Sequence, residues 1–135
     1  MLLLDASVWM SALDRDDRFY ADALALTIAR ADMTVLDLTL YEVANAVTRR
    51  FGTAAPAKAA VRGVLAACTR PPAQVDIDTI SAAVEIAAEH KLTAYDAAYV
   101  AVARHHGWTL VSTDIKDLVS RELALTPDEA IAVVD

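Results

Sequence analysis

The chain has 135 residues, a formal net charge of −7 and a hydrophobic fraction of 56%. This length suits one domain with a full core, so we expect a single domain over residues 1–135. The acidic balance excludes a broadly basic nucleic-acid-binding surface, although net charge does not decide what one local site binds. A single cysteine excludes an internal disulfide and a cysteine-rich zinc cluster. With no apolar leader and no apolar run of membrane length, we expect a soluble, cytoplasmic protein with no membrane partner.

Short apolar runs alternate with amphipathic helical stretches along the chain. In chain order, the predicted elements are a strand at 1–4, helices at 7–13 and 17–31, a strand at 33–38, helices at 40–51 and 56–70, a short strand at 74–77, helices at 78–91 and 94–106, a strand at 108–112, a short helix at 115–122 and a last strand at 130–134. Thr39 and Glu42 are expected to form a capping box at the third helix. This alternation predicts an α/β fold of three layers, α/β/α, around a parallel sheet of about four or five short strands.

Two acidic residues follow predicted strands of this sheet. Asp5 comes directly after the apolar run "LLL", and Asp114 comes two residues after "LVS". In parallel α/β sheets, ligands bind beyond the carboxyl ends of the strands. Asp5 also suits a helix cap, but Ser7 could serve that cap instead. We therefore expect Asp5 and Asp114 at one functional edge.

Asp96 and Glu42 lie in the first turns of predicted helices. Asp96 is the only charged residue between Thr93 and Ala103, so a solvated helix face does not explain it. It also suits a capping pair with Thr93, and Glu42 suits a polar helix face. If these two carboxylates join Asp5 and Asp114, their repulsion requires bound protons or a cation.

A set of oxygen ligands without nearby Cys or His favours Mg²⁺, with Mn²⁺ as a substitute, over zinc. We expect Asp5, Asp96 and Asp114 to bind the metal, and Glu42 to bind through water or to orient the attacking water. The three histidines lie near predicted helix ends, where a cation is favoured in any case.

Four blocks of the sequence carry a family resemblance: "LLLDASVW", "TLYEVANAV", "LTAYDAAYVAVA" and "LVSTD". Each holds one of the four acids, and together they resemble the PIN-domain ribonucleases, most closely the short toxins of VapBC toxin–antitoxin pairs. The resemblance implies an acidic pocket of Asp5, Glu42, Asp96 and Asp114. It implies supporting hydroxyls at Ser7 and Ser112, and a further acid at Asp117. It also implies metal-dependent RNA hydrolysis, inhibition by a cognate antitoxin and a homodimer. For such a substrate, the cations that could contact the RNA backbone are Arg15, Arg18, Arg49, Arg50, Lys58 and Arg62.

Two other classes of function remain open from the residues. A phosphoacceptor signalling domain also places acids around Mg²⁺, but it usually has adjacent acids after its first strand and a lysine after its last core strand. Here Ala6 follows Asp5, and "LVSTD" contains no lysine. A non-catalytic interaction module would use the acids as helix caps and the apolar surplus as an interface.

Overall fold

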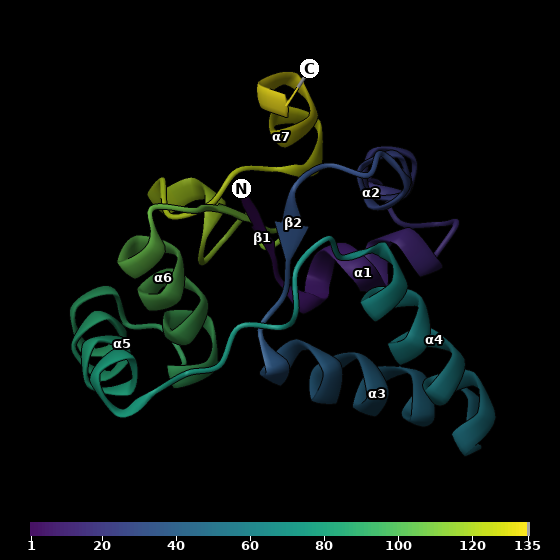
Figure 1. The fold of residues 1–135 in the computed structure, drawn as a ribbon, viewed down its shortest axis with the longest axis horizontal. Coiled ribbons are helices and arrows are strands. Elements are labelled where there is room, and N and C mark those ends of the chain that lie inside the picture. The colour runs from purple at the N-terminus through teal and green to yellow at the C-terminus, as the bar shows by residue number, and fades with distance from the viewer. Residues whose placement is uncertain (135) are drawn as a thin grey trace.

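The computed structural model describes residues 1–134 and has a small parallel sheet between two layers of helices (Figure 1). Its elements are β1 (Leu2–Leu4), α1 (Ala6–Leu13), α2 (Tyr20–Ile28), β2 (Met33–Thr34), α3 (Asp37–Phe51), α4 (Ala54–Ala67), α5 (Ile77–His90), α6 (Ala94–His106), β3 (Thr109–Val111), the 3₁₀ turn η1 (Val119–Arg121) and α7 (Pro127–Val134). None of the helices within residues 1–134 is long and apolar enough to cross a bilayer.

The sheet has the strand order β2-β1-β3, and both strand pairs are parallel. In the centre of the sheet, Leu3 lies opposite Thr34 on one side and Leu110 on the other. Because all the strands run in the same direction, the segments after β1, β2 and β3 leave the sheet at one edge. This shared edge brings residues from distant parts of the sequence together.

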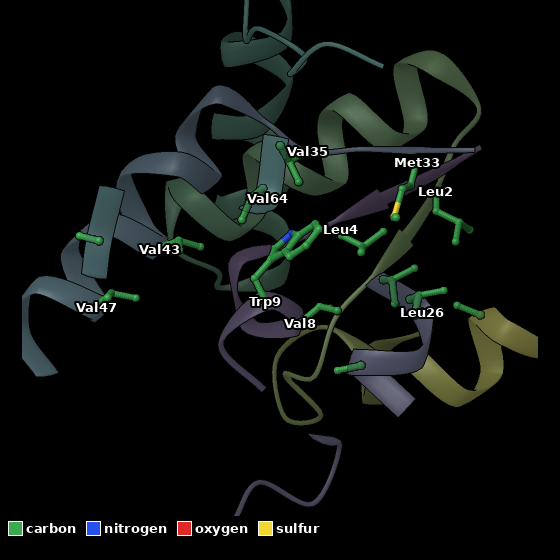
Figure 2. Close-up of a cluster of buried hydrophobic side chains, with 14 residues drawn as sticks. Leu2, Leu4, Val8, Trp9, Leu26, Met33, Val35, Val43, Val47 and Val64 are labelled. Carbon is green, nitrogen blue, oxygen red and sulfur yellow. The ribbon is translucent and has the colours of Figure 1, made fainter. Parts of the chain in front are cut away.

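The alternation of side chains along β1 divides the core into two clusters. Leu2 and Leu4 join a buried cluster with residues of α1, α2, α3, α4 and α7 (Figure 2). Leu3, on the opposite face, packs with α5 and with the almost fully buried run from Ala97 to Ala103 of α6. An uninterrupted apolar β1 thus serves both helix layers, as Figure 1 shows on the two sides of the strands.

The expected sheet of four or five strands is wrong: the described residues form three strands, with two isolated bridges. At 74–77 no strand forms, because Asp76 accepts a hydrogen bond from the Thr79 N–H (2.8 Å) and starts α5 at Ile77. Only Ala73, just before this segment, bridges to Leu36. The fold class itself is as predicted.

The predicted last strand, 130–134, is the helix α7 instead. Glu129 in its first turn accepts a hydrogen bond from the Thr126 N–H (2.8 Å), and Pro127 occupies the first helical position, where proline is favoured. Ala130 is buried while Val133 is 66% exposed, so one face of a helix packs, and not alternate residues of a strand.

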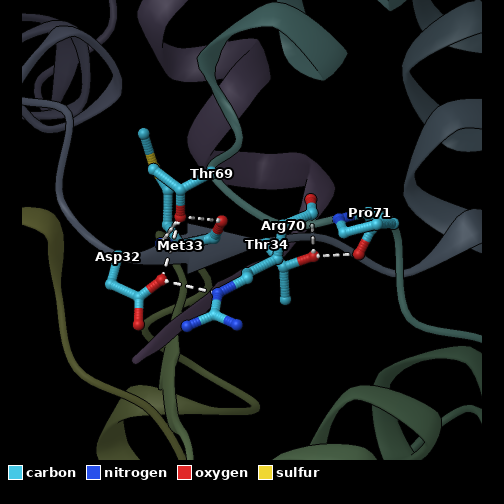
Figure 3. Close-up of polar contacts among 6 residues, drawn as sticks. All are labelled: Asp32, Met33, Thr34, Thr69, Arg70 and Pro71. Carbon is cyan, nitrogen blue, oxygen red and sulfur yellow. Dashed lines mark hydrogen bonds and ion pairs between the residues drawn. The ribbon is translucent and has the colours of Figure 1, made fainter.

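Side chains hold the free edge of β2 (Figure 3). Thr69 accepts a hydrogen bond from the Met33 N–H (3.0 Å) and donates one to Asp32 (2.9 Å), and the Thr34 hydroxyl donates to the Pro71 carbonyl (2.8 Å). The segment 69–71 therefore covers the outer edge of β2 without adding a strand.

Candidate functional site

Asp5 follows β1 and is the N-cap of α1. Its Oδ1 accepts hydrogen bonds from the backbone N–H groups of Ser7 (2.9 Å) and Val8 (3.3 Å) and from the Ser7 hydroxyl. The residue is only 6% exposed, and burial raises the pKa of Asp5 from 3.8 to about 6. Asp5 is therefore both a helix cap and a buried acid at the carboxyl end of the central strand.

Two serines connect the end of β1 with the end of β3. The Ser7 Oγ lies 3.3 Å from the Ser112 Oγ and accepts a hydrogen bond from the Thr113 N–H (2.9 Å). Ser112 in turn accepts one from the Asp114 N–H (3.0 Å). Burial of Asp5 outweighs the opposing effect of both serine hydroxyls, which lower the pKa of Asp5. The two expected supporting hydroxyls thus lie between the acids of the two strands.

Glu42 lies in α3 and is held by a tyrosine from α6. The Tyr99 hydroxyl donates to the Glu42 Oε2 (3.0 Å) and lies 2.8 Å from the Thr39 Oγ1, which accepts a hydrogen bond from the Leu36 N–H (3.2 Å). Burial raises the pKa of Tyr99, so its hydroxyl stays protonated. Because the one hydroxyl proton of Tyr99 goes to Glu42, the Thr39 hydroxyl must donate its proton to Tyr99. The hydrogen bonds therefore run in one direction, from Thr39 through Tyr99 to Glu42.

The expected capping box of Thr39 with Glu42 is wrong. The helix begins at Asp37, three residues earlier than predicted, so Thr39 is the third helical residue and its hydroxyl reaches back to Leu36. Glu42 is consequently free to turn toward Tyr99 and the sheet edge. Sequence reasoning missed Tyr99, although its position three residues after Asp96 puts both on neighbouring turns of one helix.

Asp96 occupies the first turn of α6, as predicted. The capping Thr93 accepts a hydrogen bond from the Asp96 N–H (3.1 Å) and donates one to its Oδ2 (2.9 Å). Burial, and then the charges of Asp114 and Asp117, raise the pKa of Asp96, against the lowering effect of Thr93. The capping role and the expected place beside other acids therefore coexist.

Asp114 and Asp117 form a turn after β3. Asp114 Oδ1 accepts a hydrogen bond from the Asp117 N–H (2.9 Å), and Asp117 Oδ1 accepts one from the Arg121 Nη2 (3.2 Å). Arg121 also donates to the carbonyl of His90 at the end of α5. Arg121, which the sequence did not single out, thus anchors the acidic turn to the neighbouring helix.

These carboxylates act on one another through their charges. Burial raises the pKa of Glu42 first, and the charges of Asp5 and Asp96 add to the rise despite the hydrogen bond from Tyr99. Asp96 is affected in turn by the two acids after β3. We call this set the acidic cluster, and its members are Asp5, Glu42, Asp96, Asp114 and Asp117.

The acidic cluster suits a hard cation in its chemistry but is not a ready-made cage. Within residues 1–134, no three acidic, His or Cys side chains are close enough to hold a metal ion directly between them. Its donors are carboxylate and hydroxyl oxygens, and a cation would relieve the repulsion that raises the acids' pKa values. Mg²⁺ keeps several of its waters when bound, so it needs few direct protein ligands.

A second concave feature, which we call the apolar groove, lies among α1, α2, α3 and α4. Its volume is about 570 Å³, and its rim includes Leu13, Ile28 and Phe51, which are more than half exposed. Trp9 lines it, and its buried Nε1 has no hydrogen-bond partner among residues 1–134 (Figure 2). A buried donor without an acceptor is costly.

Comparisons with known proteins agree with this architecture. A family model of the PIN domain matches residues 2–120. PAE2754 from Pyrobaculum aerophilum is 25% identical and has a TM-score of 0.72, over 98% of this chain and 88% of that chain. VapC20 from Mycobacterium tuberculosis, described as a Sarcin-Ricin loop cleaving toxin, is 22% identical with a TM-score of 0.72, over 86% of this chain and 92% of that one.

A toxin–antitoxin complex from Klebsiella pneumoniae includes a chain that is 18% identical, with a TM-score of 0.70 over 94% of this chain and 98% of that one. A comparison with curated proteins found no match. The family model covers the sheet, six of the seven helices and all the residues of the acidic cluster. This chain belongs to the PIN domain family.

Proposed function

We propose that this chain is a magnesium-dependent endoribonuclease that hydrolyses RNA phosphodiester bonds at the acidic cluster. The proposal is supported by the match to the PIN domain family, by the places of Asp5 and Asp114 after parallel strands that end at one sheet edge, and by the charges through which Glu42 and Asp96 are affected by the neighbouring acids. The similarity in fold to VapC20 supports RNA as the substrate. Neither of the other function classes needs four acids brought together in this way.

In the proposed site, Asp5, Asp96 and Asp114 would hold the metal. The bound cation would supply a water of lowered pKa and offset the negative charge that develops on the phosphate. Glu42, fixed by Tyr99, orients the attacking water by accepting one of its hydrogen bonds. The Ser7 hydroxyl donates to the Asp5 carboxylate, Ser112 accepts a hydrogen bond from the backbone N–H of Asp114, and Asp117 adds negative charge that acts on Asp96.

Purified protein is expected to cleave single-stranded RNA in Mg²⁺ or Mn²⁺, and removal of the metal with EDTA is expected to slow cleavage at least about 100-fold. The measurement is the initial rate of fragment formation on a labelled RNA, with excess Mg²⁺ added back as the control. An EDTA-resistant rate would contradict the metal's role. A stable phosphoryl adduct on Asp5 after treatment with acetyl phosphate, without RNA cleavage, would identify the signalling class instead.

We also propose that the chain is the toxin of a toxin–antitoxin pair and that a segment of the antitoxin occupies the apolar groove. The supporting observations are the exposed apolar rim of the groove and the likeness to chains of toxin–antitoxin complexes. A homodimer is a further proposal by family resemblance. None of the residues that line the apolar groove belongs to the acidic cluster.

Ala60→Arg is expected to weaken capture of the antitoxin at least about tenfold, because it places a charge in the apolar groove. The measurement is co-purification with a candidate antitoxin that is co-expressed with this chain. The matched control is Ala66→Arg, at an exposed position of the same helix that does not line the groove. Equal capture by the two variants would show that the antitoxin binds elsewhere, and both should keep metal-dependent cleavage.

A further inference from the structure

Charge is distributed very unevenly along this acidic chain. Residues 43–75, from the second turn of α3 through α4 to the segment before α5, contain five of the 12 Lys and Arg residues and none of the 19 Asp and Glu residues. A polyanion approaching a protein of net charge −7 is attracted only where the local sign reverses. This segment is the largest such reversal in the sequence.

Two of the five cations already have partners. Arg70 pairs with Asp32 (3.2 Å), and Arg50 lies 3.8 Å from Asp14 and lines the apolar groove. The other three cations are exposed and form no ion pair within residues 1–134. They are Arg49, Lys58 and Arg62.

Two of these three cations share a groove with α3. Lys58 and Arg62, one turn apart on α4, line a concave surface of about 350 Å³ together with Thr48 and the small side chains of Ala44 and Ala57. We call this surface the basic groove. It does not share lining residues with the apolar groove, so the two faces of the α3–α4 pair differ in chemistry.

Arg49 lies on the face of α3 that carries Glu42, whereas Ala44 and Thr48 of the basic groove lie on another face of this helix. Glu42 and Arg49 are seven residues apart, which places them on one face of the helix and about 10 Å apart along its axis. Phosphates that lie along this face would pass from the acids to Arg49, and Thr48, the chain neighbour of Arg49, lines the groove that holds the cations of α4. By contrast, Arg15 and Arg18 lie in a loop with three aspartates, which offset their charge.

We propose that the basic groove and Arg49 bind the phosphate backbone of single-stranded RNA beside the bond that the acidic cluster cleaves. This inference rests on the proposed function, and it narrows the six candidate cations to the three that are exposed and unpaired. Contacts from Lys and Arg to phosphates position RNA without reading its sequence. The bases of the RNA therefore remain available for recognition by other parts of the protein surface.

The test is binding of a short fluorescein-labelled single-stranded RNA, followed by fluorescence anisotropy in EDTA at several salt concentrations. The triple variant Arg49→Ala, Lys58→Ala, Arg62→Ala is expected to bind at least about tenfold more weakly, and its slope of log affinity against log salt should be smaller by about 2. The matched control, Arg15→Ala, Arg18→Ala, Arg104→Ala, loses the same charge elsewhere and should keep the wild-type slope. Thermal melts confirm that both variants fold.

An unchanged slope in the first variant, or an equal loss in the control, would overturn the inference. Failure of the proposed function is distinguishable, because wild-type protein would then bind RNA through these cations without cleaving it in Mg²⁺ or Mn²⁺. If wild-type protein cleaves RNA while the first variant binds RNA as the wild type does, the nuclease function is supported and the proposed RNA-binding surface is wrong.

Discussion

Asp5→Asn is expected to lower the rate of RNA cleavage at least about 100-fold while leaving the fold intact. Asparagine still accepts the hydrogen bonds from Ser7 and Val8 that cap α1, so the helix keeps its start. It removes the charge at the centre of the acidic cluster. Loss of a group that only supports a metal ligand lowers metal affinity or activity about 10- to 100-fold, so loss of a ligand itself should lower the activity further. The measurement is the initial cleavage rate in saturating Mg²⁺.

Asp78→Asn is the matched control for this experiment. Asp78 is an exposed acid in the first turn of α5 and lies outside the acidic cluster. Its variant should cleave RNA at the wild-type rate. If Asp5→Asn cleaves as fast as Asp78→Asn, Asp5 is only a helix cap.

Burial of Asp5 is expected to make the metal-free protein less stable as the pH rises. The pKa of Asp5 is about 6 in the folded state and 3.8 without burial, so between these values the folded state binds more protons than the unfolded state. The free energy of unfolding therefore falls through this window, by about 3 kcal/mol in total from this group. This loss is present in full above pH 6 and absent below about pH 4.

The measurement is urea unfolding of the wild type and of Asp5→Asn across this pH range in EDTA. Because asparagine does not titrate, the variant should become more stable relative to the wild type as the pH rises. Parallel stability curves would show that Asp5 is not buried as a charged group. Added Mg²⁺ should stabilise the wild type more than the variant, since a ligand of the folded state raises the free energy of unfolding.

The edge on which the acids lie was predictable from the sequence, because it depends on local signals. A continuous apolar run predicts β1, and Asp5 comes directly after it. Thr93 and Gly107 bound α6, as predicted, and so fix Asp96 in its first turn. With parallel strands, the carboxyl ends must meet, whatever the intervening segments do.

The strands that were wrong depended on tertiary contacts. The run "AIAVV" contains β-branched residues suited to a strand, but Pro127 and Glu129 start a helix there. Within this run, only Ala130 is buried. The role of Tyr99 could not be predicted from the sequence either, because its partners Thr39 and Glu42 lie about 60 residues earlier in the chain. Local patterns do not specify which buried hydroxyl meets which carboxylate.

The pairing of β1 with β3 has a consequence for biosynthesis. The first carboxylate leaves the ribosome early, but it has no neighbours from β3 until residues 109–117 emerge from the exit tunnel. A nascent chain or a prematurely terminated product would thus carry Asp5 without Asp114. The proposed nuclease site therefore forms only after β3 has been made and has paired with β1.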